Sequence, residues 1–372
     1  MNKICHVTSA HSRNDTRIFH KECVSLANNG YDVTLLIAEK EKDVSEKKNG
    51  VSIFSVKFNP KNKIDRIINS PRVLLKKAIE INADIYHFHD PELLQIAMKI
   101  KRKGKKVVFD SHEDVCGQIL GKKWIPRQLR PIVSFLYKCY SNRILSKLDY
   151  LIGVTPHLVE KLKRVNPKTE LITNYPVLYL DVNNIDVSYC HRKSFCFAGG
   201  ITKQWNHETI LLALENIDSV YDLIGRADLE YISKLKEYKS WNKVKYHGIV
   251  PQEEVKKILG SCDVGLAVLD CSDNTCGKIG TLGNTKLFEY MQAGLPVICT
   301  DFVLWKEIID KWKCGICIPP GDVGALQKAM QYIIDNPDKA KKMGENGRRA
   351  VLEEFNWGKE EKKLISLYSK LV

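Results

Sequence analysis

The sequence predicts an α/β protein of two domains, each built on a parallel β-sheet. Its 372 residues exceed one ordinary α/β core and fit two domains of roughly 150 to 200 residues each. Short apolar runs rich in β-branched residues alternate with helical patterns along the chain, as crossover connections between parallel strands require. The same alternation starts again after residue 190, which indicates a second sheet.

The first half carries six apolar runs with strand character. They are Ile4–Thr8, Asp32–Ile37, Val51–Val56, Asp84–His89, Lys106–Asp110 and Tyr150–Thr155. Helical patterns such as Arg17–Asn28 and Pro91–Arg102 lie between them. Strands separated by helices predict a parallel sheet in this domain.

The second half repeats the pattern, with a helix expected at His207–Leu214. The expected strands are Ser194–Ala198, Tyr221–Ile224, Val244–Tyr246, Val264–Leu269, Val297–Thr300 and Ile316–Ile318. Asn174–Cys190, which carries Pro176 and several Asp and Asn residues, is typical of a connection, and Lys359–Leu371 predicts a terminal amphipathic helix. The predicted divisions are therefore residues 1–180, 190–355 and 356–372.

Composition and the N-terminal segment narrow the class of protein. Hydrophobic residues make up 44% and charged residues 27%, as in folded globular proteins. The start MNKICHVTS lacks the features of a signal peptide, and no apolar stretch reaches the roughly 18 residues of a spanning helix, so we expect a cytoplasmic location.

The 12 cysteines are scattered along the chain. Cys314 and Cys317 have no second pair to complete a zinc site, and we expect reduced, buried thiols.

The formal charge of +14 is concentrated in the first half. Residues 1–175 contain 32 Lys and Arg against 18 Asp and Glu, whereas the remainder contains 26 of each kind. Such asymmetry indicates a polyanionic surface facing the N-terminal domain. Nucleic acid and anionic lipid are the two classes of partner that this charge suits.

One segment favours lipid. Gln118–Leu148 has seven basic and no acidic residues, interleaved with aromatic and aliphatic ones such as Trp124 and Phe135. This is typical of an interfacial helix on an anionic leaflet, and the membrane-facing candidates are Lys122, Lys123, Arg127 and Arg130. An ordinary helix with a solvated basic face is the alternative, and we expect no nucleic-acid partner.

The strongest local signal is NTKLFEYMQAGLPVICTD, residues 284–301. Asn284 or Thr285 can cap a helix that ends near Gly294, and a loop entering a helix N-terminus suits a diphosphate. Lys286 would add a positive charge. Glu289, on a helix expected to be largely buried, needs partners, and ribose hydroxyls would serve.

This segment resembles the donor-binding signature of glycosyltransferase family 4, whose members have the GT-B fold, and the resemblance extends along the chain. HVTSAHSRNDTRIFHKECVSLANNGYDVTLL, HFHDPELL, FDSHEDV, LITNYP and FAGGITK are similar to the family's landmarks and occur in the expected order. The resemblance implies two Rossmann-like domains facing across a cleft, with the C-terminal helix returning to the first domain. It also implies a retaining transferase that uses a UDP- or GDP-sugar, as in surface polysaccharide synthesis on a lipid carrier or saccharide acceptor.

The resemblance also implies roles for particular residues. Glu289 would bind the donor ribose, and His112 would lie beside the donor sugar and the reacting centre. The residues expected near the donor diphosphate are Asn284, Thr285, Lys286, Gly199, Gly200, Lys203 and Arg226. The residues expected to line the acceptor cleft are Asp15, Arg17, His89 and Asp90.

Two positions depart from the family pattern. Members commonly have a second glutamate eight positions before Glu289, where this chain has Thr281, and a basic residue followed by glycine where it has Trp205 and Asn206. Lys203, Arg226 or Lys286 must then neutralise the phosphates. No Asp-x-Asp pair occurs in the sequence, so we expect no metal and no cofactor, with electrostatic preorganisation stabilising the departing diphosphate.

Other functions fit parts of the sequence. A metal-dependent hydrolase would use the cluster expected at two strand ends, namely His87, His89, Asp90, His112, Glu113 and Asp114. The second sheet with its phosphate-binding loop would then have no role. Thr281 and Trp205 motivate a catalytically silent scaffold, and a nucleotide-sugar epimerase is a related alternative. Asp90 before Pro91 also has the pattern of a simple helix cap.

Overall fold

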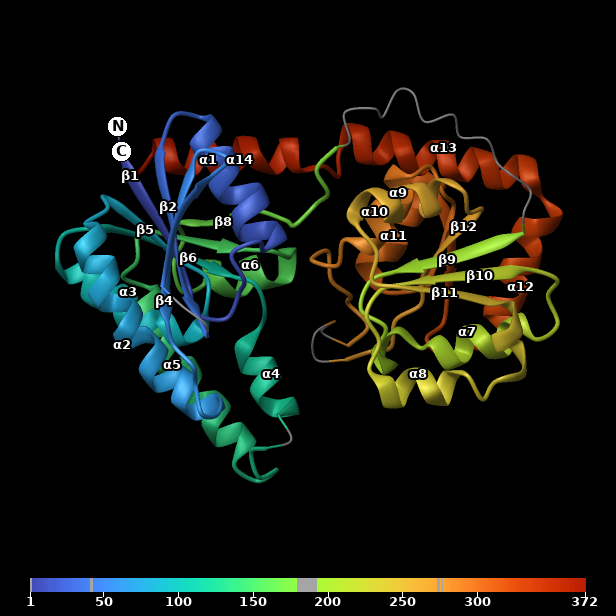
Figure 1. Ribbon diagram of the computed structural model, residues 1–372, viewed down its shortest axis with the longest axis horizontal. Coiled ribbons are helices and arrows are strands. Elements are labelled where there is room, and N and C mark those ends of the chain that lie inside the picture. The colour runs from blue at the N-terminus through green and yellow to red at the C-terminus, as the bar shows by residue number, and fades with distance from the viewer. Residues whose placement is uncertain (1, 41–42, 123, 179–192, 273–274, 276) are drawn as a thin grey trace. The chain divides into compact units, whose positions relative to one another are not determined.

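The computed structural model describes residues 2–40, 43–122, 124–178, 193–272, 275 and 277–372. The chain forms two compact units (Figure 1). Unit 1 comprises Met1–Asn174 and Trp357–Val372, and unit 2 comprises Tyr175–Asn356. The predicted boundaries at residues 180 and 190 lie outside the described residues.

Unit 1 contains an eight-stranded sheet in the order β3-β4-β2-β1-β5-β6-β7-β8. Its strands are Lys3–Thr8 (β1), Asp32–Glu39 (β2), Val44–Lys48 (β3), Val51–Lys57 (β4), Ile85–Phe88 (β5), Lys106–Ser111 (β6), Tyr150–Gly153 (β7) and Thr169–Leu171 (β8). All neighbours are parallel except β3, which runs antiparallel to β4. The sequence prediction missed β3 because VSEKK is a charged edge strand without an apolar run, and it missed β8 because that strand has three residues.

The helices of unit 1 cover both faces of this sheet (Figure 1). They are η1, a π-helix (Thr16–Cys23), α1 (Val24–Asn28), α2 (Lys63–Ile81), the 3₁₀ turn η2 (Pro91–Leu93), α3 (Leu94–Arg102), α4 (Val115–Gly121), α5 (Arg130–Leu145), α6 (Pro156–Lys163) and α14 (Trp357–Ser369). The predicted helix at Arg17–Asn28 is therefore a π-helix that continues into a short α-helix. The single basic helix predicted over Gln118–Leu148 is wrong, since a loop containing Pro126 separates α4 from α5.

Unit 2 contains a six-stranded sheet in the order β11-β10-β9-β12-β13-β14. All of its neighbouring strands are parallel: Ser194–Ala198 (β9), Val220–Ile224 (β10), Val244–Gly248 (β11), Val264–Ala267 (β12), Val297–Thr300 (β13) and Gly315–Ile318 (β14). Its helices are η3 (Lys203–Trp205), α7 (His207–Leu214), α8 (Leu229–Leu235), η4 (Lys239–Lys243), α9 (Gln252–Gly260), α10 (Lys286–Gln292), α11 (Val303–Trp312), α12 (Val323–Asp335) and α13 (Pro337–Glu353). The prediction of two parallel-sheet units is confirmed.

The C-terminal helix α14 belongs to unit 1 although α13, before it, belongs to unit 2. The Trp357 side chain is buried, and its Nε1 donates a hydrogen bond to Ser25 Oγ at 2.9 Å. Tyr368 is fully buried against β5, where its hydroxyl lies 2.8 Å from His87 Nδ1. These contacts confirm the predicted return of the C-terminal helix to the first domain.

Among the described residues, no helix combines the length and the hydrophobicity needed to cross a bilayer. The described cysteines are free thiols, and many of them are buried. Burial raises the pKa of Cys314 to about 12, which makes this half of the Cys314–Cys317 pair a poor nucleophile at neutral pH.

Candidate functional site

Each sheet reverses its strand order at one point, and the predicted site residues follow the strands that flank it or, for His112 and Arg226, the next strand along. In unit 2 the point lies between β9 and β12, and in unit 1 it lies between β1 and β5. Ligands of open parallel sheets bind beyond the carboxyl ends of the strands at such a point. Both units therefore present their predicted residues where the topology favours a ligand.

In unit 2, Lys286 and Gly199 come together at this point. Gly199 follows β9 with φ +145°, and a Cβ built on it would lie 2.2 Å from Lys286 Cε and 2.6 Å from Nζ. The lysine side chain therefore passes directly over the glycine backbone. Burial lowers the pKa of Lys286, although the Glu289 carboxylate opposes this shift. In the part of the chain that the structure describes, no ion pair of this ammonium is found.

Trp205, which departs from the family pattern, supports the Lys286 ammonium. Its ring centroid lies 4.4 Å from Nζ, and the ring of Phe197 is 5.5 Å away. An ammonium over an indole face is stabilised electrostatically. Asn206, where the pattern has glycine, adopts the left-handed conformation at φ 48°, which asparagine tolerates better than most residues.

Gly200, Lys203 and Arg226 line one hollow of about 860 Å³ beside these residues. The chain packs tightly here, since a Cβ on Gly225 would lie 1.8 Å from the carbonyl oxygen of Gly199. Only glycine fits at position 225, whose φ is +133°. The sequence prediction did not include Gly225, although it directly follows β10 as Gly199 directly follows β9.

The helix with the strongest sequence signal, α10, has seven residues and begins at Lys286. Asn284 Oδ1 accepts a hydrogen bond from Lys286 N at 3.3 Å, and Thr285 makes no capping bond with its side chain. A helix this short has a small dipole, so the positive charge comes mainly from the Lys286 side chain. Glu289 is partly buried, and within the described ranges its carboxylate forms neither a hydrogen bond nor an ion pair.

In unit 1, His112 follows β6 and is held by Asp110. Its Nε2 lies 3.1 Å from Asp110 Oδ2 and 3.3 Å from Nδ1 of His89. The His112 side chain is 19% exposed, while Asp110 is fully buried. Burial alone would raise the pKa of Asp110, but Arg17 and His112 lower it well below its ordinary value. Asp110 thus fixes the orientation of the His112 ring.

Arg17, His89 and Asp90, which were expected to line an acceptor cleft, have buried side chains. Arg17 is 5% exposed, and its Nε lies 2.9 Å from Asp110 Oδ2. His89 and Asp90 are each 3% exposed. The Asp90 side chain does not cap η2; its Oδ2 accepts hydrogen bonds from Thr8 Oγ1 at 2.7 Å and from Ser9 N at 2.6 Å.

Asp15 and His11 lie at the accessible edge of this group. Asp15 Oδ1 accepts hydrogen bonds from the backbone of Arg17 and Ile18, which caps η1. His11 Nδ1 lies 3.3 Å from Asp15 Oδ2, and its Nε2 lies 3.5 Å from Asp90 Oδ1. Burial alone would lower the pKa of His11, but these carboxylates raise it. His11 is absent from the predicted site although it stands within the HVTSAHSRND segment that carries the resemblance.

The predicted membrane-facing residues lie on or between α4 and α5. Lys122 and Arg127 are exposed, whereas Arg130 turns inward and its Nε donates to the Ile125 carbonyl at 2.9 Å. Lys123 lies outside the described residues. Large apolar side chains beside them face solvent: Leu120, Trp124, Leu129, Ile132, Phe135, Leu136 and Tyr140.

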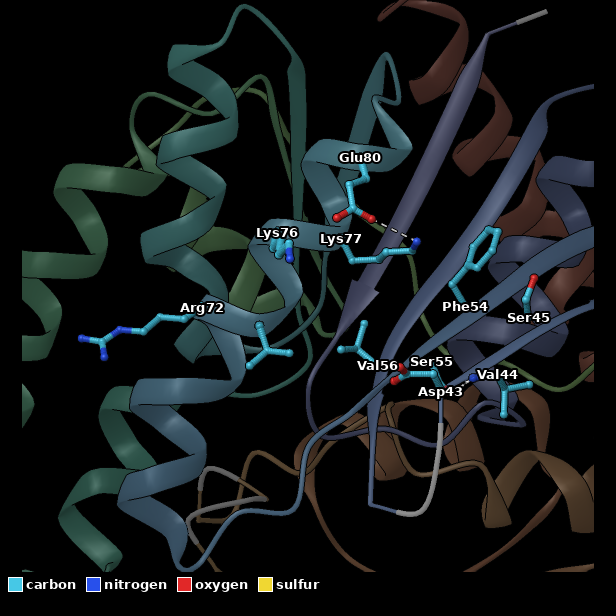
Figure 2. A pocket seen from close by; sticks show the side chains of 11 residues that line it. Asp43, Val44, Ser45, Phe54, Ser55, Val56, Arg72, Lys76, Lys77 and Glu80 are labelled. Carbon is cyan, nitrogen blue, oxygen red and sulfur yellow. Dashed lines mark hydrogen bonds and ion pairs between the residues drawn. The ribbon is translucent and has the colours of Figure 1, made fainter.

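A further hollow of about 670 Å³ lies between the β3–β4 edge and α2 in unit 1 (Figure 2). Lys77 reaches Glu80 across 3.1 Å, and Arg72 points away from the hollow. No residue of the predicted site lines it. We assign it no role in the reaction.

Comparison with known families decides the identity. Residues 16–174 match the family described as Glycosyltransferase Family 4, and residues 187–350 match the family described as Glycosyl transferases group 1. The chain is a group 1 glycosyltransferase of the family 4 type.

This glycosyltransferase is 22% identical over 308 residues to the O-antigen chain mannosyltransferase C of Escherichia coli. The aligned segment covers 80% of this chain and 78% of the relative. Among solved structures, it matches sucrose-phosphate synthase from Thermosynechococcus elongatus with TM-score 0.78 and 17% identity, over 100% of this chain and 99% of the other. It also matches Anabaena Alr3699/HepE in complex with UDP, with TM-score 0.69 and 12% identity, over 100% of both chains. The predicted GT-B fold is confirmed.

The geometry is at odds with the hydrolase alternative in its original form. Asp114 caps α4 and pairs with Lys161 at 2.6 Å, and Glu113 contacts Gln118 on the same helix. Among the described residues, neither carboxylate belongs to a group of close ligand atoms with His112. The group 1 glycosyltransferase assignment accounts for both sheets, whereas a hydrolase leaves the second sheet without a role.

Proposed function

We propose that this glycosyltransferase moves a sugar from a UDP- or GDP-sugar to a lipid-linked or saccharide acceptor in surface polysaccharide synthesis, with retention of the anomeric configuration. The observation that carries the proposal is the Lys286 ammonium held over Gly199 at the switch point of unit 2. A partly buried ammonium without a carboxylate partner is costly, and a diphosphate would supply the missing negative charge. The UDP complex of the Anabaena protein and the O-antigen relative support this choice of donor and pathway.

The donor would be held by groups that the structure brings to one end of the unit 2 sheet. Lys286, with Lys203 and Arg226 from the neighbouring hollow, would neutralise the two phosphates. The Glu289 carboxylate would accept hydrogen bonds from the ribose. Side-chain cations placed in advance stabilise the leaving diphosphate in the transition state, so we propose that transfer needs no metal at the diphosphate.

The acceptor and the reacting sugar would lie beside the unit 1 residues. His112 is partly exposed and held through Nε2, which leaves Nδ1 for a ligand. His11 and Asp15, at the accessible edge, are placed to contact acceptor hydroxyls. Arg17, Asp110 and His89 are buried beneath them and would position His112 rather than contact the acceptor.

We also propose that unit 1 docks on the cytoplasmic face of an anionic membrane through α4, α5 and the loop that joins them. Phe135 is 65% exposed, Leu136 60% and Trp124 55%. An apolar patch this continuous marks an interaction surface, and the exposed basic residues Lys122 and Arg127 suit anionic headgroups. A lipid-linked acceptor would be reached from this position.

The docking proposal is tested by cosedimentation with phosphatidylglycerol vesicles at physiological salt. The double substitution Phe135→Ser with Leu136→Ser should reduce partitioning at least tenfold, since each side chain contributes roughly 1.5 to 3 kcal/mol when it leaves water. A matched control replaces the exposed pair Arg102 and Lys103, at the end of α3, by serine. Equal partitioning of the first variant and the control, or binding to DNA in place of vesicles, would contradict the proposal.

The transferase proposal is tested by acceptor-dependent release of UDP or GDP. A catalytically silent scaffold, which Thr281 motivates, would release neither. A nucleotide-sugar epimerase would convert the donor without an acceptor. Release of nucleotide that requires a lipid-linked or glycan acceptor, and an anomeric configuration retained in the product, are the expected results.

A further inference from the structure

A fully buried cluster of three histidines and one glutamate lies beneath the unit 1 site. His6 comes from β1, Glu22 from η1, His87 from β5 and His89 from the residue after β5. The side chains of His6, Glu22 and His89 are 0% exposed, and His87 is buried as completely. These residue types, neutral imidazole nitrogens and one carboxylate oxygen, are ligands that Zn²⁺ prefers.

Several polar atoms of this cluster have no hydrogen-bond partner. His87 Nε2 and both carboxylate oxygens of Glu22 are buried without a hydrogen-bond partner in the described part of the chain. Glu22 Oε1 is 3.0 Å from Arg17 Nε, but the Arg17 Nε–H group donates its hydrogen bond to Asp110 Oδ2 at 2.9 Å. Buried acceptors of this kind are costly unless something occupies the space between them.

The distances between three of the polar atoms suit a metal ion. His6 Nδ1 lies 3.0 Å from His89 Nε2, and Glu22 Oε2 lies 3.8 Å from the first nitrogen and 3.9 Å from the second. A triangle with these three sides has a circumscribed radius of about 2.1 Å, so an ion at the usual 2.0 to 2.2 Å of zinc bonds would lie in or close to the plane of the three atoms. His87 completes a set whose ligand atoms all lie within 4.8 Å of one another.

The remaining ring nitrogens have partners that orient the ligands. Tyr368 OH lies 2.8 Å from His87 Nδ1 and 3.4 Å from His6 Nε2. His89 Nδ1 faces His112 Nε2 at 3.3 Å. Outer partners of this kind hold the imidazoles of known metal sites in place. Burial lowers the pKa of each of the three histidines, which keeps the rings neutral, as metal ligands must be.

We propose that His6, Glu22, His87 and His89 bind one divalent transition-metal ion, preferably Zn²⁺, as a structural site that ties η1 to β1 and β5. The site is closed on all sides, so the ion would enter during folding and would not exchange with substrate. It lies in unit 1 and has no part in neutralising the donor diphosphate. Coordination would displace any proton held by Glu22, whose pKa burial raises.

A neighbouring group, His89 with Asp110 and His112, also has close ligand atoms. Its carboxylate oxygen, Asp110 Oδ2, already pairs with Arg17 at 2.9 Å. By contrast, Glu22 pairs with Arg17 through Oε1 and directs Oε2 to the histidines. This difference assigns the ion to the deeper group.

The test begins with the untagged full chain, unfolded in guanidinium with EDTA and refolded with Zn²⁺, with Co²⁺ or without metal. Elemental analysis after gel filtration should find about one ion per chain, and the Co²⁺ form should have the visible absorption of a four-coordinate site. Protein refolded without metal should melt roughly 10 °C lower. Wild-type protein that refolds to the same Tm and retains no metal would overturn the proposal, and a buried water would then occupy the cluster.

Variants separate the two groups. Glu22→Gln keeps the size of the side chain and should lower Zn²⁺ affinity by 10- to 100-fold or more. His207→Gln, a matched control at a buried histidine of unit 2, should retain the ion. If Asp110→Asn abolishes binding while Glu22→Gln does not, the assignment to the deeper group is wrong. Should Glu22→Gln fail to fold, the metal content and the Co²⁺ spectrum of the wild type still decide the question.

Discussion

Replacement of Lys286 by methionine separates binding from stability more sharply than other changes in unit 2. Methionine keeps an apolar stem over Trp205 and removes the ammonium that lies 4.4 Å from that ring. A hydrogen bond between a charged donor and a diphosphate is worth about 1.5 to 3 kcal/mol, which corresponds to a roughly 10- to 150-fold weaker Kd. We expect that loss for whichever nucleotide, UDP or GDP, the wild type binds.

The same substitution should leave stability unchanged or increase it. Burial lowers the pKa of Lys286 below its ordinary 10.5, so in the pH range between the two values the unfolded chain binds more protons than the folded one. Stability of the wild type therefore rises with pH through this range, because ∂ΔG/∂pH is positive when the unfolded state holds the extra proton. In Lys286→Met this contribution to the rise is absent.

Isothermal titration with UDP and GDP measures the first effect, and urea unfolding between neutral pH and pH 10 measures the second. Lys342→Met, at an exposed lysine of α13 paired with Glu345 at 3.7 Å, is the matched control and should change neither quantity by more than a few tenths of a kcal/mol. An unchanged nucleotide Kd in Lys286→Met would show that this partly buried ammonium has no role in donor binding.

Three further substitutions test other parts of the account. Gly199→Ala combines a disfavoured φ of +145° with a clash against Lys286, and should lower the free energy of unfolding by about 1 to 3 kcal/mol. Its control, Gly260→Ala, has open space around the Cβ and should be neutral. Equal melting curves of the two variants would contradict the packing of Gly199 against Lys286. Asp110→Asn should lower turnover at least tenfold and leave the nucleotide Kd unchanged. It should also destabilise unit 1 by about 3 to 5 kcal/mol, because buried Arg17 loses a partner. Unaltered steady-state kinetics would exclude a role of Asp110 in positioning His112. Trp357→Ala removes a buried ring and its bond to Ser25 at a cost of about 3 to 5 kcal/mol, and a denaturant midpoint equal to that of wild type would show that α14 does not hold to unit 1.

The parallel strands were predictable from sequence because both faces of each sheet are covered, so the strands are continuous apolar runs. Ser194–Ala198 and Val297–Thr300 agree residue for residue with the structure. The edge strand Val44–Lys48 carries charges on an exposed surface, and no hydrophobic pattern distinguishes such a strand from a loop. The π-helix at Thr16–Cys23 has the spacing of an ordinary helix in sequence and differs only in its backbone hydrogen bonds.

The site was predictable where local chemistry decides it and not where distant residues meet. Lys286 and Gly199 were identified one by one, the first from a helix start and the second from the resemblance of FAGGITK to the family. The contact of Trp205 with Lys286 joins residues far apart in the chain, and its position was interpreted only as a departure from the family pattern. The His6–His89 contact spans 83 positions, so no spacing motif could reveal the buried cluster.

The basic segment shows a third limit on what the sequence can predict. Its charge count was correct, but charge alone does not say which side chains reach solvent. Arg130 turns toward the Ile125 carbonyl, while Phe135 and Leu136 face outward. The proposed docking surface is consequently more apolar and less basic than the sequence indicated.

Calorimetric titration of the wild type and of Glu289→Ala with UDP and GDP decides whether this end of the unit 2 sheet binds the donor nucleotide. The account predicts that the wild type binds one of the two nucleotides, and that the variant, which keeps the buried face of α10, unfolds like the wild type but binds that nucleotide at least tenfold more weakly. Nucleotide binding of equal strength in both proteins, or of neither nucleotide to the wild type, would contradict a donor site at this end of the unit 2 sheet.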